Sequence, residues 1–223
     1  APVLILFGYL ADALVATRRM RMESYHMAML ANDWQLIGLM YMLLDVAIIL
    51  TGCVLIGFSW RDARGVALLM LQRTLRTLIF SIWNYAVFLH YVVDVGCLLM
   101  LLANRQSQRQ KAAFERQREK DERRLQILIL VARICMSCVC LSWIVENHLK
   151  PLAVVWFVLM VLGIRCKLLA SLTIVPLMCQ EYGWLIWGWD DFTISMQFTN
   201  SLIGKAAAFL LMTLVGGGKW SLE

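Results

Sequence analysis

Apolar runs of about helix length follow one another along most of the chain, separated by short polar segments. A transmembrane helix needs about 20 mostly apolar residues to cross a hydrocarbon core about 30 Å thick. Most of the runs approach this length, and the sixth is short for a full span. The pattern predicts an all-α, polytopic transmembrane helix bundle of about seven to eight helices. The expected helices are 3–16, 36–58, 65–83, 87–103, 125–145, 152–164, 168–187 (interrupted by Pro176) and 195–215.

One long polar stretch, residues 105–124, divides this pattern and contains eight basic and four acidic residues. Lys111 and Glu115, like Glu119 and Arg123, stand four positions apart, so much of the stretch can form a solvated helix. We interpret it as a connector between two transmembrane halves, residues 1–104 and 125–223. The halves share weak similarities around their Gly-Arg turns and later helix glycines, which makes two four-helix repeats of the same orientation an option.

Charge and composition fit a membrane protein better than a nucleic-acid-binding one. The chain is 61% hydrophobic and 16% charged, and the connector holds +4 of the net charge of +6. With eight crossings, the connector and both chain ends lie on one side, which then holds thirteen of the seventeen Lys and Arg residues outside the predicted helices. This is the distribution that the positive-inside rule gives for the cytoplasmic, matrix or stromal side. We expect the lipid bilayer as a partner and no nucleic acid.

Two features are expected on the side of the membrane opposite to the connector, an interfacial helix and an aromatic, acidic edge. A basic, Met-rich segment at 18–34 is typical of an interfacial helix. An aromatic belt meeting an acidic aqueous edge is expected near the end of the seventh helix. No basic segment precedes the apolar run that follows Ala1, so no intact signal peptide is expected. The candidate edge consists of Trp184, Trp187, Trp189, Asp190 and Asp191.

Charged residues within the predicted spans form a candidate intramembrane polar site. A charge at the middle of a bilayer costs at least about 2.5–3.5 kcal/mol, so such residues usually pair inside the bundle or face water. We expect Lys205 to face the interior, with Asp94 as its first candidate partner and Asp12 as its second. Internal ion pairs and a polar ligand groove remain equal alternatives. The site candidates are Asp12, Asp94, Arg133 and Lys205; Asp45, Arg73 and Arg76 also lie in or near spans.

Catalytic signatures are not found in the sequence. It has no Ser/His/Asp set, no phosphate-binding glycine loop and no paired Cys/His spacing, so we expect no enzyme, no metal and no cofactor other than bound lipids. The seven cysteines lie in or beside apolar runs, and Cys135 and Cys138 are interpreted as small apolar residues at helix contacts. Gly96 and Gly204 are expected at close helix contacts.

Several stretches, taken together, resemble the surfeit-locus cargo receptors of the endoplasmic reticulum (ER), which are related more distantly to DoxX-type membrane proteins. The resemblance implies a polytopic ER–Golgi protein that collects soluble secretory cargo on the lumenal side. The stretches keep their order and spacing along nearly the whole chain. They are residues 50–55, Leu75 to Trp83, 98–103, Leu162 to Ala170, and Asp191 through Gly204 to Gly218.

The sequence departs from that family in its polar residues. The acidic pair of the first helix is Ala11-Asp12, the second glycine of the last helix is Lys205, and the lysine-rich retrieval signal is missing from the printed end. Two functions follow as expectations. One is a cargo receptor of the ER and Golgi. The alternative is a non-catalytic structural accessory subunit of a larger membrane complex, for example respiratory or photosynthetic, in a mitochondrial or plastid inner membrane.

Overall fold

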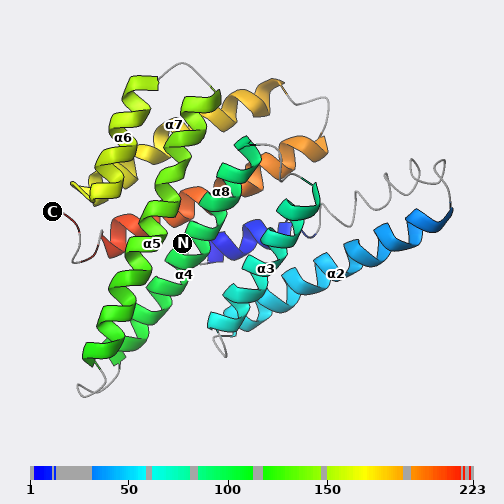
Figure 1. Cartoon of the computed structure of the whole chain (residues 1–223), viewed down its shortest axis with the longest axis horizontal. Coiled ribbons are helices and arrows are strands. Elements are labelled where there is room, and N and C mark those ends of the chain that lie inside the picture. The colour runs from blue at the N-terminus through cyan, green and yellow to red at the C-terminus, as the bar shows by residue number, and fades with distance from the viewer. Residues whose placement is uncertain are drawn as a thin grey trace.

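The computed structural model describes residues 3–11, 13, 32–58, 62–80, 85–112, 118–146, 150–187, 192–216, 218 and 221. These residues are almost entirely helical, and no strand occurs among them. The N-terminal residues 3–11 form a helical segment, and the labelled helices follow it (Figure 1). They are α2 (Asn32–Gly57), α3 (Asp62–Phe80), α4 (Tyr85–Ala112), α5 (Arg118–Glu146), α6 (Lys150–Leu162), α7 (Cys166–Trp187) and α8 (Phe192–Val215).

The all-α fold expected from the apolar runs is confirmed, and the helix boundaries agree closely for α2, α3, α6 and α8. Helices α4 and α5 are longer than their apolar runs because both continue into the charged stretch. Residues 105–112 end α4 and residues 118–124 begin α5, so the connector is largely two polar helix ends. Ala, Arg, Lys, Glu and Gln dominate this stretch, and all are strong helix formers. The expected interfacial segment at 18–34 lies mostly outside the described residues.

Helix α7 corrects one detail of the sequence interpretation, because it runs through Pro176 without interruption. Proline removes one backbone donor, and neighbouring helices can accommodate that loss inside a transmembrane helix. Helix α6 has 13 residues, which confirms that it is short.

Helices α4 and α5 form an antiparallel pair around which the others are arranged (Figure 1). From α5 the chain passes through neighbouring helices α6, α7 and α8, and α8 returns to pack against α4. Helix α3 packs on α4, and α2 packs on α3. In Figure 1 the joined ends of α4 and α5 project at the lower left beyond the other helices. This arrangement places α4 next to α3, α5 and α8, so α4 can link polar residues from several helices.

The interior is apolar and closely packed, while many large apolar side chains also lie on the outside. Gly96 of α4 shows how tightly α4 and α5 meet, since a Cβ added there would lie 2.8 Å from the backbone nitrogen of Met136. A Cβ added at Gly204 would meet no other atom of the described residues within 4 Å, so the expected close helix contact at this glycine is wrong. The exposed apolar residues on α2, α5, α6 and α7 include Leu43, Leu44, Val54, Ile127, Val131, Leu152, Val155, Leu168 and Val175.

Two of the described helices are long and apolar enough to cross a membrane. These segments are Phe88–Arg109 of α4, with 22 residues, and Glu122–Ser142 of α5, with 21 residues. Shorter apolar helical segments are Leu43–Gly57, Pro151–Leu162, Cys166–Cys179 and Ile203–Val215. A weak indication of a membrane protein follows from the two long segments.

The turn between α6 and α7 is built around Gly163, whose φ of 74° is left-handed. The Gly163 amide donates to the Met160 carbonyl, and the Ile164 amide donates to the Leu159 carbonyl at 3.0 Å. These two bonds form a Schellman motif, in which glycine at the left-handed position ends a helix. The motif reverses the chain within three residues, so that α7 starts at Cys166.

Candidate functional site

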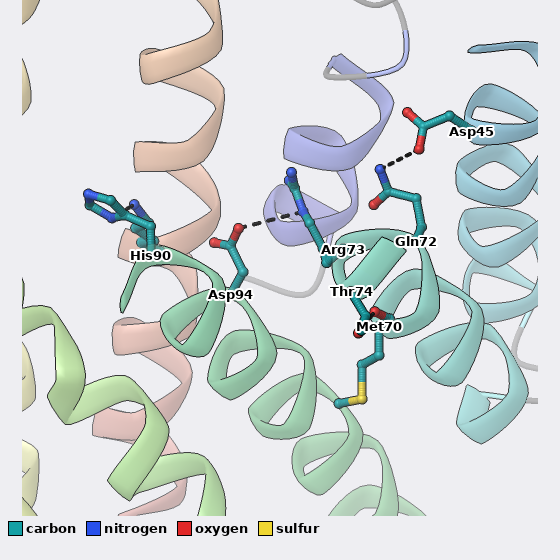
Figure 2. Close-up of polar contacts among 8 residues, drawn as sticks. Asp45, Met70, Gln72, Arg73, Thr74, His90 and Asp94 are labelled. Carbon is teal, nitrogen blue, oxygen red and sulfur yellow. Dashed lines mark hydrogen bonds and ion pairs between the residues drawn. The ribbon is translucent and has the colours of Figure 1, made fainter. Parts of the chain in front are cut away.

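The centre of the candidate site is an ion pair between α3 and α4. Arg73 Nε lies 3.5 Å from Asp94 Oδ2, and both side chains are less than one-fifth exposed. Figure 2 shows the Arg73 side chain on α3 pointing toward Asp94 on α4. Opposite charges at this distance in a poorly hydrated interior attract each other strongly, which offsets part of the cost of burying them. The pair therefore fixes how α3 and α4 meet.

The N-terminal segment contributes an aromatic ring to the same arginine. Tyr9 is buried, and Arg73 Cζ lies 4.8 Å from the centre of its ring. A guanidinium at this distance over an aromatic face makes a cation–π interaction, which is strengthened when both groups are shielded from water. Arg73 thus joins residues 3–11 to α3 and α4.

A second polar contact joins α4 to α8. Lys205 is only 4% exposed, and its Nζ lies 3.1 Å from Nδ1 of His90. An ammonium group has donors but no acceptor. As the donor in this contact, the Lys205 ammonium requires Nδ1 of His90 to be the acceptor. His90 and Asp94 are one helical turn apart on α4, so the two contacts lie on neighbouring positions of one helix face.

Two further hydrogen bonds belong to this polar site, one from α3 to α2 and one between α3 and α4. Gln72 Nε2 donates to Asp45 Oδ1 at 2.8 Å, and Figure 2 shows Gln72 turned away from Asp94, toward α2. Thr74 and Tyr91 join α3 to α4 through their hydroxyl groups, which are 2.9 Å apart. Consecutive residues of α3 therefore make polar contacts with two neighbouring helices.

Arg133 belongs to a different part of the fold. It is 2% exposed, and its guanidinium lies against Gly163 in the α6–α7 turn, where a Cβ would come within 2.9 Å of Cζ. Ser221, near the printed end of the chain, reaches the same glycine. Arg133 of α5 and Ser221 therefore both lie against the α6–α7 turn.

The expected interior position of Lys205 agrees with its burial, and α4 is indeed the helix that supplies its partner. The partner residue is His90, whereas Asp94 pairs with Arg73. Asp12, the second expected partner, lies outside the described residues. Of the candidate aqueous edge, Trp189, Asp190 and Asp191 lie outside the described residues, and Trp184 and Trp187 are placed only as part of the α7 helix.

Several residues of this polar site were not predicted from the sequence, namely Tyr9, Gln72, Thr74, His90 and Tyr91. For α3 and α4 a usable signal was present. In an antiparallel helix pair, residues at similar distances from the turn face each other, and Arg73 and Asp94 stand about equally far from the turn that follows α3. No comparable local signal links His90 to Lys205, because 115 positions separate them.

The polar contacts of this site join helices to one another. Its cations and its carboxylates have partners on other helices: Arg73 with Asp94, Lys205 with His90, and Asp45 with Gln72. Among the described residues, no group of three or more His, Cys, Asp or Glu side chains could hold a metal ion. The polar residues together bind α2, α3, α4, α8 and the N-terminal segment to one another.

Comparison of the chain with known protein families, with curated proteins and with solved structures finds no match.

Proposed function

We propose that this chain is a multi-pass membrane protein. Support comes from its two long apolar helices, Phe88–Arg109 and Glu122–Ser142, and from the many large apolar side chains on the outer surface. Among the described residues, Lys205 is buried beside His90, and Arg73, which is less than one-fifth exposed, pairs with Asp94. Such pairing is expected where unpaired charge would meet hydrocarbon. Additional crossings by α2, α3, α6, α7 and α8 are part of this proposal.

Of the two functions left open by the sequence, the geometry favours a non-catalytic accessory subunit of a larger membrane complex. This choice rests on one observation, which is that polar residues inside the bundle pair with one another. Arg73 and Asp94, and likewise Lys205 and His90, use their polar atoms to join helices. A bundle whose internal charges serve its own packing suits a structural subunit. A mitochondrial or plastid inner membrane is the location that we propose for this role.

A cargo receptor of the ER and Golgi is the second candidate, and the sequence resemblance is what favours it. Some residues that carry the resemblance serve packing in this structure. Gly163 allows the α6–α7 reversal, and Leu98 and Leu101 are fully buried on α4. The resemblance therefore rests partly on positions that determine the fold, which a subunit without receptor activity would also keep.

Purification at native expression separates the two functions. A tag would be added to the full gene product in its own cell, and the membranes would be solubilised in a mild detergent. An accessory subunit migrates on a native gel with one large complex and stays at fixed stoichiometry through further purification. A small particle that captures soluble secretory proteins in variable amounts would instead favour the receptor and overturn our choice.

A further inference from the structure

Two exposed basic residues, Arg165 in the α6–α7 turn and Lys167 in the first turn of α7, lie where the chain passes the middle of α5. Arg165 and Lys167 are both exposed, and within the described residues neither forms an ion pair. The first turn of α7 contains no acidic residue. Positive charge at this turn is therefore left without a protein counter-charge in the described part of the chain.

The height of the turn is fixed by its contact with α5. Gly163 lies against Arg133, which is near the middle of the apolar segment Glu122–Ser142. Arg123, at the polar end of that segment, is ten residues away, or about 15 Å along a helix. Figure 1 shows the α6–α7 turn beside the middle of α5, well above the end of the α4–α5 pair.

The surroundings of the turn are apolar on the outside. Leu162 and Leu168, which flank the turn, are each about half exposed. Between the level of the turn and the polar end of α5, Ile127 and Val131 are also exposed. Arg165 and Lys167 therefore project from a surface whose other side chains suit lipid chains.

The short helix α6 explains how a bilayer can meet this turn. Its 13 residues span about 20 Å, whereas a typical hydrocarbon core is about 30 Å thick. A bilayer accommodates a short hydrophobic stretch by becoming thinner, and long basic side chains then extend toward the headgroups. Phospholipid headgroups would thus lie nearer to the middle of the bilayer at α6 and α7 than along α5.

We infer that Arg165 and Lys167 bind the phosphate of an anionic phospholipid at this locally thinned position. The two cations supply charge complementarity, and Leu162 and Leu168 contact the acyl chains. Arg133 lies against the turn from the inside of the bundle. The site rests on the proposed membrane insertion, but not on the choice between an accessory subunit and a receptor.

The test uses the full chain reconstituted into phosphatidylcholine vesicles that contain a minor fraction of phosphatidylglycerol. Native mass spectrometry then counts the phosphatidylglycerol molecules that remain bound. The variant R165Q/K167Q is compared with R123Q/R124Q, which removes the same charge from exposed positions at the start of α5. Because each basic residue near an anionic surface contributes about fivefold in affinity, R165Q/K167Q should bind phosphatidylglycerol about 25-fold more weakly.

The control variant should stay within about twofold of the original protein, because Arg123 and Arg124 follow the acidic residues Asp121 and Glu122, which offset their charge. An equal loss of bound phosphatidylglycerol in both variants, or no loss in either, would contradict the proposed lipid site. Displacement of the lipid by millimolar inorganic phosphate would also overturn it, since the turn would then recognise the free anion. Failure of the unmodified chain to enter vesicles would instead contradict the proposed membrane insertion, on which the site depends.

Discussion

Lys205 Nζ on α8 lies 3.1 Å from His90 Nδ1 on α4, although the two residues are 115 positions apart in sequence. The partner of this buried lysine is therefore a histidine and not a carboxylate. Because a histidine carries no negative charge, removing the lysine leaves no buried anion without a partner. This difference from the Arg73–Asp94 pair leads to a testable ranking of substitutions.

Lys205→Met should cost less stability than Arg73→Met. The first substitution leaves one imidazole nitrogen without its partner, which costs about 1–2 kcal/mol. The second leaves the Asp94 carboxylate without its cation and removes the contact with Tyr9, so we expect about 3 kcal/mol. Thermal unfolding of the detergent-solubilised variants measures both.

The double variant Arg73→Met, Asp94→Leu serves as the matched control for this ranking, because it removes both charges. It should recover at least half of the loss caused by Arg73→Met. Equal unfolding temperatures for the two single variants would show that the Arg73–Asp94 pair contributes no more than the Lys205–His90 contact.

Gly96→Ala and Gly204→Ala should have opposite effects on stability. A Cβ at Gly96 meets backbone and side-chain atoms of α5 below 3.0 Å, which forces α4 and α5 apart at a cost of about 1–3 kcal/mol. Within the described residues a Cβ at Gly204 meets nothing within 4 Å, and alanine favours a helix by about 0.5–1 kcal/mol over glycine. The midpoint temperatures should fall and rise, respectively. A drop of similar size in both variants would contradict the close α4–α5 contact.

Arg109→Gln should destabilise the protein although the arginine is more than half exposed. Its Nη2 lies 2.7 Å from Oδ2 of Asp62, a carboxylate that is 2% exposed at the start of α3. Without the arginine the buried carboxylate loses its cation, while the positive end of α3 still moderates the charge. We expect a loss of about 1–2 kcal/mol.

Arg123→Gln is the control for this contact, because Arg123 is exposed at the start of α5. Its unfolding free energy should change by no more than about 0.5 kcal/mol. An equal effect of the two substitutions would mean that the polar end of α4 does not depend on the Asp62 contact.

The sequence was informative wherever local periodicity decides structure. Apolar runs predicted the helices, and Pro151 and Gly163 stand at the start of α6 and at its end, as their backbone preferences require. The burial of Lys205 followed from the cost of exposing an ammonium group to hydrocarbon.

The choice of partners needed tertiary structure. From the sequence alone, either Lys205 or Arg73 could pair with Asp94. The relative positions of α3 and α4 bring Arg73 to it. Gly204 and Gly96 look alike in sequence, yet only Gly96 faces a neighbouring helix closely. Arg133 resembled the other buried charges and instead supports the α6–α7 turn.

The side on which each turn emerges tests the multi-pass arrangement most directly. In a variant without native cysteines, single cysteines would replace Arg64, Arg124 or Arg165, which are exposed near the α2–α3, α4–α5 and α6–α7 turns. A membrane-impermeant maleimide would be applied to sealed vesicles of known orientation. We predict that all three cysteines react from the same side only. Reaction of any one from the opposite side, or of all three from both sides, would contradict the arrangement.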